Sequence, residues 1–494
     1  MMRERNRSVA MRRVFGGAAL ALALLATAPS AAAPTASVTN VDPARLAGLP
    51  EFVDGVMAQQ IATREVAGAV VTVVSGGKVV FSKGYGYADI DRKIPVDGEK
   101  TLFRPGSVSK LFTWTALMQQ VEKGRVKLDD DVNKYLDFKI PATYAKPILV
   151  RDLLTHAPGL EDRGGITVES PAGFVPLGTF LKNNIPTRVR DSGVETSYSN
   201  YGSAIAGYIV ERVSGEAFPD YIDRHIFSPL GMTSATFREP LTGTRAENMA
   251  LGYELKDGRF VAKPFELYGN IMPAGSASAT GPDMARFMLA HLGDGALGDA
   301  RILKPETMKL MRETLHKNAP SLPGMAYGYM VVREAGPRLV GHGGNTADFH
   351  SFLILAPEAD FGFFVSTTGG WGSYGARTEL QNAIIGRVFP ENPAPRWTGT
   401  STPTVGAYRT NRRTYSDPPQ PEFDIKVSAS GPHGLVVENR GNKTYWEQIG
   451  PQLYEQVTAA RDGGPFEKLE FYGPENDRKM SFSSQPHVLY RVVK

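Results

Sequence analysis

The chain has 494 residues, 42% of them hydrophobic and 21% charged, which is the composition of a folded protein of two or three domains. It contains no cysteine, which excludes disulfides, a thiol nucleophile and cysteine-ligated zinc. The formal net charge is +4, and the first 33 residues alone carry five arginines and one glutamate. The remainder is therefore balanced in charge and does not favour nucleic-acid binding.

The N-terminus has the pattern of an export signal. Its arginines precede an apolar run over about 14–28, and small residues follow at 30–33. This predicts a signal peptide over residues 1–33, and Arg12 and Arg13 are compatible with twin-arginine export. The run is shorter than the roughly 20 residues of a membrane helix, so an uncleaved anchor is the weaker alternative. We expect a periplasmic or secreted protein with no membrane span after cleavage.

The following segments predict strands at both ends of a main domain and helices between them. A helix is expected over 50–64, and a β-hairpin over 70–74 and 79–83 with its turn at 75–78. The middle region, about 102–297, is mainly helical. Strand patterns return at 352–355 and 361–365. We therefore predict an α/β (α+β) fold, in which an antiparallel sheet from both ends carries an inserted helical lobe and leaves a cleft for a site.

The helical pattern stops near residue 392. Short strands are predicted beyond it at 423–427, 435–437, 445–448, 453–456, 468–472 and 489–493. Short strands at close spacing are typical of a small barrel or sandwich, here of roughly 90 residues. We expect a signal peptide at 1–33, a main domain at 34–391, a linker at 392–404 and an all-β accessory domain at 405–494.

The strongest chemical pattern is Ser107-x-x-Lys110 at the start of a predicted helix that ends near Gly124. A serine hydroxyl needs a base to become a nucleophile, and a lysine three residues later lies on the same helix face. Burial would favour the neutral amine that can act as this base. Ser109 is a rival nucleophile on the same turn, but only Ser107 has a lysine at this spacing.

Two further segments carry polar groups suited to acyl chemistry. Tyr198 and Asn200 precede a predicted helix; a tyrosine there could relay a proton, and an asparagine could donate to a carbonyl. The segment from His342 through Gly344 to Asn345 is glycine-rich, so its backbone could lie against a ligand and supply an oxyanion donor. Taken alone, each segment is better explained as an ordinary turn, with a surface tyrosine in one and an incidental histidine in the other.

Together, and in this order, the three segments resemble the serine β-lactamase and penicillin-recognising family, specifically its class C β-lactamase, D-alanyl-D-alanine carboxypeptidase, D-aminopeptidase and esterase branch. Stretches 102–110, 153–160 and 229–232 also resemble that family. The resemblance implies a β-lactamase/transpeptidase-like fold, an acylated Ser107, Lys110 as its base and Tyr198 as a second proton shuttle. It also implies that Asn200, His342 and Gly344 bind substrate, and that the amides of Ser107 and Asn345 form the oxyanion hole. No metal or cofactor is implied.

The third segment departs from the family pattern, since His-Gly-Gly stands where β-lactamases usually have Lys-Thr-Gly or Lys-Ser-Gly. A neutral histidine is a weaker partner for a β-lactam carboxylate. The sequence therefore favours an exported hydrolase of small esters or D-amino-acid-containing peptides. The alternatives are a β-lactamase and a low-turnover penicillin- or cell-wall-binding protein. The oligomeric state is not predicted, and neither a G-x-S-x-G elbow nor an H-E-x-x-H zinc motif is present.

Overall fold

The computed structural model describes residues 41–334, 336–399, 402–457 and 463–493. The predicted signal peptide lies outside these residues. Within the described chain, no helix has the length and apolar character needed to cross a membrane.

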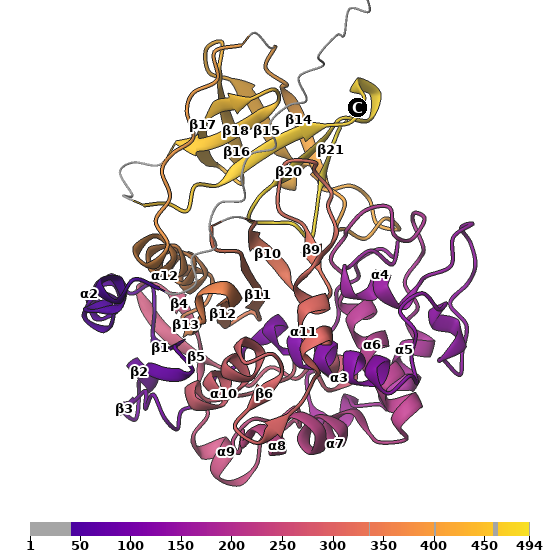
Figure 1. Cartoon of the computed structure of the whole chain (residues 1–494), viewed down its shortest axis with the longest axis vertical. Helices are drawn as coiled ribbons and strands as arrows, with labels where there is room; N and C mark the ends of the chain where they lie inside the picture. Colours follow the sequence, from indigo (N-terminus) through magenta and orange to yellow (C-terminus); the bar gives the residue numbers. More distant parts are fainter. Residues whose placement is uncertain (1–40, 335, 400–401, 458–462, 494) are drawn as a thin grey trace, which may run out of the picture. The chain divides into compact units, whose positions relative to one another are not determined.

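A nine-stranded antiparallel sheet forms the centre of the main domain, and its order is β3-β2-β1-β13-β12-β11-β10-β9-β8 (Figure 1). Its strands are β1 (Gly68–Ser75), β2 (Lys78–Asp89), β3 (Ile94–Pro95), β8 (Thr314–His316), β9 (Met325–Ala326), β10 (Met330–Arg333), β11 (Leu339–Asn345), β12 (Phe349–Ala356) and β13 (Phe361–Thr368). Strand β1 pairs with β13 along its whole length. The sheet is therefore built from strands that are far apart in the chain, as the sequence predicts.

Both faces of the sheet are covered, so β1 is buried along its whole length. Val71 and Val73 pack in one hydrophobic core with helices α2 and α12, whereas Val70 and Val74 belong to a second core with the inserted helices. This division follows from the alternation of side chains along a strand. The α-helices of the described chain are α1 (Pro43–Leu46), α2 (Leu49–Ala62), α3 (Lys110–Glu122), α4 (Val150–Leu154), α5 (Leu177–Asn183), α6 (Asn200–Ser214), α7 (Phe218–Ile222), α8 (Ser228–Leu230), α9 (Gly243–Glu247), α10 (Gly281–Leu292), α11 (Pro305–Arg312) and α12 (Trp371–Val388).

The C-terminal strands close into an eight-stranded barrel with its own hydrophobic core. They are β14 (Gly406–Thr410), β15 (Ile425–Ala429), β16 (Gly434–Asn439), β17 (Asn442–Gly450), β18 (Leu453–Val457), β19 (Lys468–Tyr472), β20 (Lys479–Phe482) and β21 (Tyr490–Val492). The sequence did not distinguish a barrel from a sandwich, and the structure shows a barrel. Two smaller hairpins, β4 (Gly252–Lys256) with β5 (Arg259–Lys263) and β6 (Ala296–Leu297) with β7 (Ala300–Arg301), lie within the main domain.

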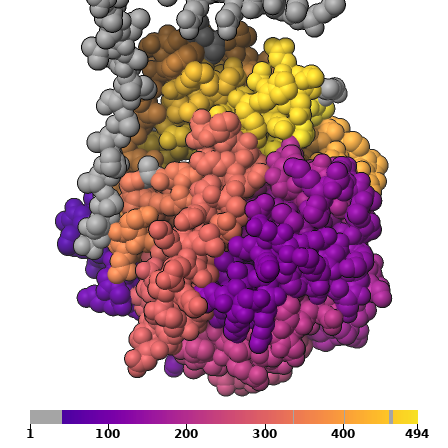
Figure 2. All heavy atoms as spheres, turned by 45° about the vertical axis from the view of Figure 1, so that its right-hand side comes forward, coloured from indigo at the N-terminus to yellow at the C-terminus, as the bar shows by residue number. Residues whose placement is uncertain are grey.

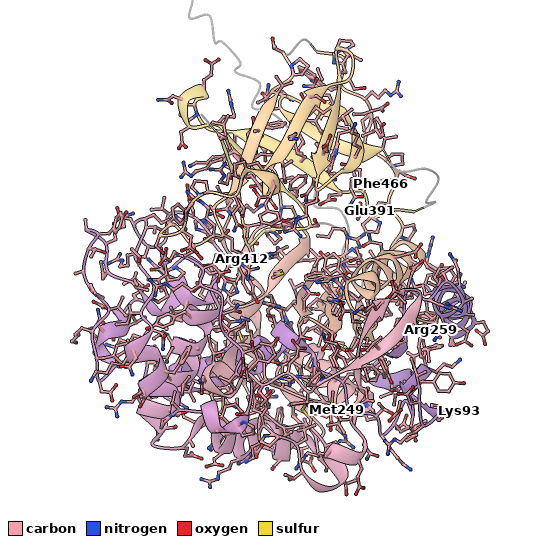
Figure 3. All side chains as sticks on the ribbon, turned by 180° about the vertical axis from the view of Figure 1, so that it is seen from behind. Lys93, Met249, Arg259, Glu391, Arg412 and Phe466 are labelled. Atoms are coloured by element: carbon pink, nitrogen blue, oxygen red, sulfur yellow. The ribbon has the colours of Figure 1, made fainter. Side chains whose placement is uncertain are left out.

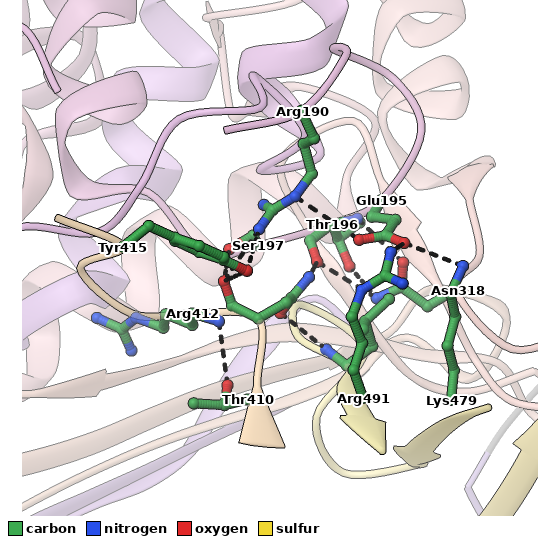
Figure 4. Close-up of polar contacts among 12 residues, drawn as sticks. Arg190, Glu195, Thr196, Ser197, Asn318, Thr410, Arg412, Tyr415, Lys479 and Arg491 are labelled. Carbon is green, nitrogen blue, oxygen red and sulfur yellow. Dashed lines mark hydrogen bonds and ion pairs between the residues drawn. The ribbon is translucent and has the colours of Figure 1, made fainter. Parts of the chain in front are cut away.

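The barrel packs directly against the main domain (Figure 2). Several hydrogen bonds cross this junction. Asn411 Nδ2, just after β14, donates to the carbonyl of Thr196 at 2.8 Å. Arg491 of β21 and Lys479 of β20 both pair with the buried carboxylate of Glu195 (Figure 4). The junction therefore fixes the loop that directly precedes Tyr198.

Candidate active site

Ser107 lies on a single 3₁₀ turn, Gly106–Ser109, that leads into α3. Gly106 has a φ of +53°, a left-handed conformation that favours glycine, and the turn brings Ser107 to a partly exposed position. The rival hydroxyl of Ser109 is completely buried and donates to the carbonyl of Gly106 at 2.5 Å. Ser107 is thus the hydroxyl on this turn that a substrate can reach.

Lys110 is the first residue of α3 and its side chain is completely buried. Its Nζ lies at hydrogen-bond distance from three oxygens: Ser107 Oγ at 2.9 Å, and the acceptors Asn200 Oδ1 at 2.9 Å and the carbonyl of Ala274 at 2.6 Å. Burial, together with the nearby charge of Arg412, lowers the pKa of Lys110 well below its ordinary value. The Lys110 amine is therefore in contact with the serine hydroxyl, in surroundings that favour its neutral form.

Tyr198 precedes α6, whose first turn is capped by Ser199 Oγ accepting from the Gly202 amide at 3.0 Å. Tyr198 is only 5% exposed, so it is not a surface tyrosine. The Nζ of Lys110 lies 4.9 Å from the centroid of its ring. Burial raises the pKa of Tyr198, and neighbouring Ser107 opposes part of this rise. The buried hydroxyl makes no hydrogen bond of ordinary geometry within the described chain.

Strand β11 carries the third predicted segment and runs against the Ser107 turn. A Cβ atom on Gly344 would lie 1.9 Å from the carbonyl oxygen of Pro105, so only glycine fits there. A Cβ atom on Gly106 would likewise lie 2.9 Å from the amide nitrogen of Asn345. The backbone of Asn345 is therefore held beside the serine, and its side chain is fixed by a 2.9 Å hydrogen bond with His350 Nδ1.

His342 is fully buried on β11. Burial, reinforced by the charge of Lys110, lowers the pKa of His342 to about 3. Its Nδ1 donates to the carbonyl of Gly343 at 2.6 Å, so the proton resides there and Nε2 presents a lone pair with no partner in the described chain. A neutral imidazole of this tautomer cannot hold an anion by charge.

Three residues around Tyr198 were not predicted as parts of the site. His156 has a φ of +54°, its Nδ1 accepts from the Ser199 amide at 3.2 Å, and its ring stacks on Tyr198 at 4.1 Å. From the sequence we expected His156 to be a loop-structuring residue, and these contacts agree with that expectation. His487 and Arg412 come from the barrel, with the His487 ring centroid 5.2 Å and the Arg412 guanidinium carbon 4.6 Å from that of Tyr198. Neither lies in a pattern that would have identified it.

The described residues contain no group of three or more His, Cys, Asp or Glu side chains that could hold a metal ion. The groups gathered around Ser107 are its hydroxyl, the Lys110 amine, the Tyr198 phenol and backbone amides of the Ser107 turn and β11. This combination suits the attack of a hydroxyl on a carbonyl.

Comparison with known proteins agrees with this geometry. The profile of the beta-lactamase family matches residues 53–384. Protein flp of Staphylococcus aureus is 27% identical over 326 residues, which cover 63% of this chain and 62% of flp. The chain thus spans about three fifths of the length of this curated relative.

Two solved structures show how far the fold extends. The octameric penicillin-binding protein homologue from Pyrococcus abyssi superposes with a TM-score of 0.59 at 23% identity, covering 90% of this chain and 100% of its own. D-amino acid amidase from Ochrobactrum anthropi SV3 has a TM-score of 0.58 at 23% identity, covering 69% of this chain and 98% of its own. At these identities the likeness is one of fold.

Proposed function

Because the chain belongs to the beta-lactamase family, we propose that it is a serine hydrolase that works through an acyl-enzyme on Ser107. The observation that carries the proposal is the 2.9 Å hydrogen bond between Lys110 Nζ and Ser107 Oγ, at a lysine that is completely buried. A neutral amine has two N–H donors and one lone pair. The acceptors Asn200 Oδ1 and the Ala274 carbonyl match the two donors, which leaves the lone pair for the Ser107 proton.

In the first half-reaction, Ser107 Oγ attacks the substrate carbonyl as its proton passes to Lys110. The amides of Ser107 and Asn345 stabilise the oxyanion, and Asn200 orients the substrate. Tyr198, protonated at neutral pH because burial raises its pKa, then delivers a proton to the leaving group. Water hydrolyses the acyl-enzyme with the same groups acting in reverse.

The proposed substrates are small esters or peptides that contain D-amino acids. The neutral state of His342 supports this choice over β-lactams, because the third segment then lacks the cation that usually binds a β-lactam carboxylate. The likeness to an enzyme named for D-amino acid amides also supports it. We further propose export, which rests on the sequence of residues 1–33 and is tested by sequencing the N-terminus of the mature protein.

The test is turnover with intact-mass measurement of the protein during the reaction. Wild type, Ser107→Ala and Ser109→Ala are incubated with a p-nitrophenyl ester, a D-alanyl peptide and a chromogenic cephalosporin. We expect an acyl adduct and product release in wild type and Ser109→Ala, and neither in Ser107→Ala. Equal turnover by Ser107→Ala would overturn the proposal, and preferred cephalosporin turnover would identify a β-lactamase instead.

A further inference from the structure

The barrel forms one wall of the catalytic site. The Tyr198 amide donates to the carbonyl of His487 at 3.0 Å, and Ser197 Oγ donates to the carbonyl of Asn411 at 3.0 Å. These partners come from the β20–β21 and β14–β15 connections of the barrel. The chain segment that holds Tyr198 is thus bound to two connections of the barrel, at Ser197 (Figure 4) and at Tyr198 itself, and the residue following Asn411 lies at the Tyr198 ring.

That residue is Arg412, which lies where the barrel meets the main domain (Figure 3). Its Nε donates to Asp162 Oδ2 at 2.8 Å, and its amide donates to Thr410 Oγ1 at 3.1 Å. The first bond orients the side chain and the second holds the backbone, with the guanidinium carbon 4.6 Å from the centroid of the Tyr198 ring. The two terminal nitrogens of the guanidinium make no hydrogen bond within the described chain, and the side chain is 36% exposed. Arg412 therefore has a fixed position and two free donors beside the site.

The other basic groups of the site cannot bind an anion by charge. Lys110 has its three hydrogen-bond positions filled by Ser107, Asn200 and the Ala274 carbonyl, and burial favours its neutral form. His342 is buried and neutral. Arg412 is a guanidinium, whose parallel donors match the geometry of a carboxylate.

We propose that Arg412 binds a carboxylate of the substrate, so that the barrel selects substrates with a free acid group. This proposal rests on the proposed function and adds a substrate class to it. Arg412 would supply, from the barrel, a cation that the third segment lacks, so acidic β-lactams are tested beside the esters and peptides by the cephalosporin assay. Arg412 would then hold the substrate on the Tyr198 side of Ser107, where the leaving-group proton is exchanged.

The test uses two matched substrate pairs. N-acetyl-D-alanyl-D-alanine and its C-terminal amide differ in a carboxylate on the leaving-group side. Mono-p-nitrophenyl glutarate and p-nitrophenyl butyrate differ in one on the acyl side. The variants are Arg412→Gln and, as the matched control, Arg413→Gln, which removes the same charge from a neighbour whose guanidinium stacks on Tyr415 at 3.9 Å.

We expect wild type to prefer the acid in at least one pair, and that pair identifies the side on which the carboxylate binds. Arg412→Gln should lower the ratio of kcat/KM for acid over neutral substrate at least tenfold, whereas Arg413→Gln leaves the ratio unchanged. Thermal unfolding of both variants verifies that the barrel remains docked. No preference in wild type, or the same change of ratio in both variants, would overturn the inference.

A separate readout distinguishes this inference from the proposed function. If Ser107→Ala turns over substrates as fast as wild type, the acyl-enzyme proposal fails, and Arg412 is then judged by binding alone. Calorimetric titration of N-acetyl-D-alanine and of its amide needs no turnover. Binding of the acid by wild type that is lost in Arg412→Gln supports the carboxylate site, and equal binding by both proteins overturns it.

Discussion

Replacing Lys110 with methionine should change the pH dependence of stability as well as abolish turnover. Burial lowers the pKa of native Lys110 well below the ordinary 10.5, so unfolding takes up a proton wherever the native lysine is neutral and the unfolded one is charged. The free energy of unfolding of wild type then rises with pH relative to Lys110→Met. The slope is up to about 1.4 kcal/mol per pH unit over the interval between the lowered native pKa and the ordinary 10.5.

The assay is urea unfolding of both proteins at pH 7, 8, 9 and 10. Lys78→Met is the matched control, because it makes the same substitution at an exposed lysine, at the start of β2. In parallel, kcat of Lys110→Met should fall about 10²- to 10⁴-fold, as expected for loss of a general base. A difference between wild type and Lys110→Met that does not change with pH would refute the reasoning, since Lys110 would then be charged in the native protein.

Three further outcomes are expected. Tyr198→Phe should lower kcat about 10²-fold or more with little change in melting temperature, because the lost hydroxyl makes no hydrogen bond of ordinary geometry in the described chain; kinetics and calorimetry check this. Gly344→Ala should lower the free energy of unfolding by about 1–3 kcal/mol and abolish turnover, because the new Cβ atom would push β11 away from the Ser107 turn. Gly343→Ala is the control: its Cβ atom meets only the Phe352 ring at 3.2 Å, so urea unfolding should show a smaller loss of stability. Burial lowers the pKa of His487 to about 3, so the free energy of unfolding should fall as pH drops from about 6.5 towards 3, by up to about 1.4 kcal/mol per pH unit. His487→Gln should flatten that slope, which acid unfolding measures.

Local patterns predicted most of the elements near the site. The expected helix at 50–64 is α2 (Leu49–Ala62), and the turn at 75–78 joins β1 to β2 because Gly76 and Gly77 both adopt positive φ. The expected barrel strand at 468–472 is β19. In the main sheet, β3 and β8 to β11 were not predicted as strands. In the barrel, β14 and β20 were missed; these two have only five and four residues and are specified by their neighbours in the closed barrel more than by their own sequence.

The site shows a similar division between local and long-range information. The structure brings Ser107, Lys110 and Asn200 into direct hydrogen-bond contact, which short sequence spacing and the order of the segments could suggest. The neutral state of His342 depends on complete burial, which no local pattern specifies. Arg412 is more than 200 residues from Tyr198, and only the docking of the barrel places the two together. Contacts between domains of this kind leave no periodicity in the sequence.

The position of the barrel also explains why the third segment can lack a cation. A charged lysine at position 342 would lie in a completely buried volume, where an unpaired charge is costly unless an anion is bound. Placing the charge on Arg412 avoids this cost, because its side chain remains partly exposed and is paired with Asp162 on one edge. The guanidinium of Arg412 therefore stays in contact with water, and it lies close enough to Tyr198 to act on a bound substrate. Substrate recognition and the tuning of Lys110 thereby depend on the same docked barrel, so a variant that loosens the Asn411 junction should impair both together.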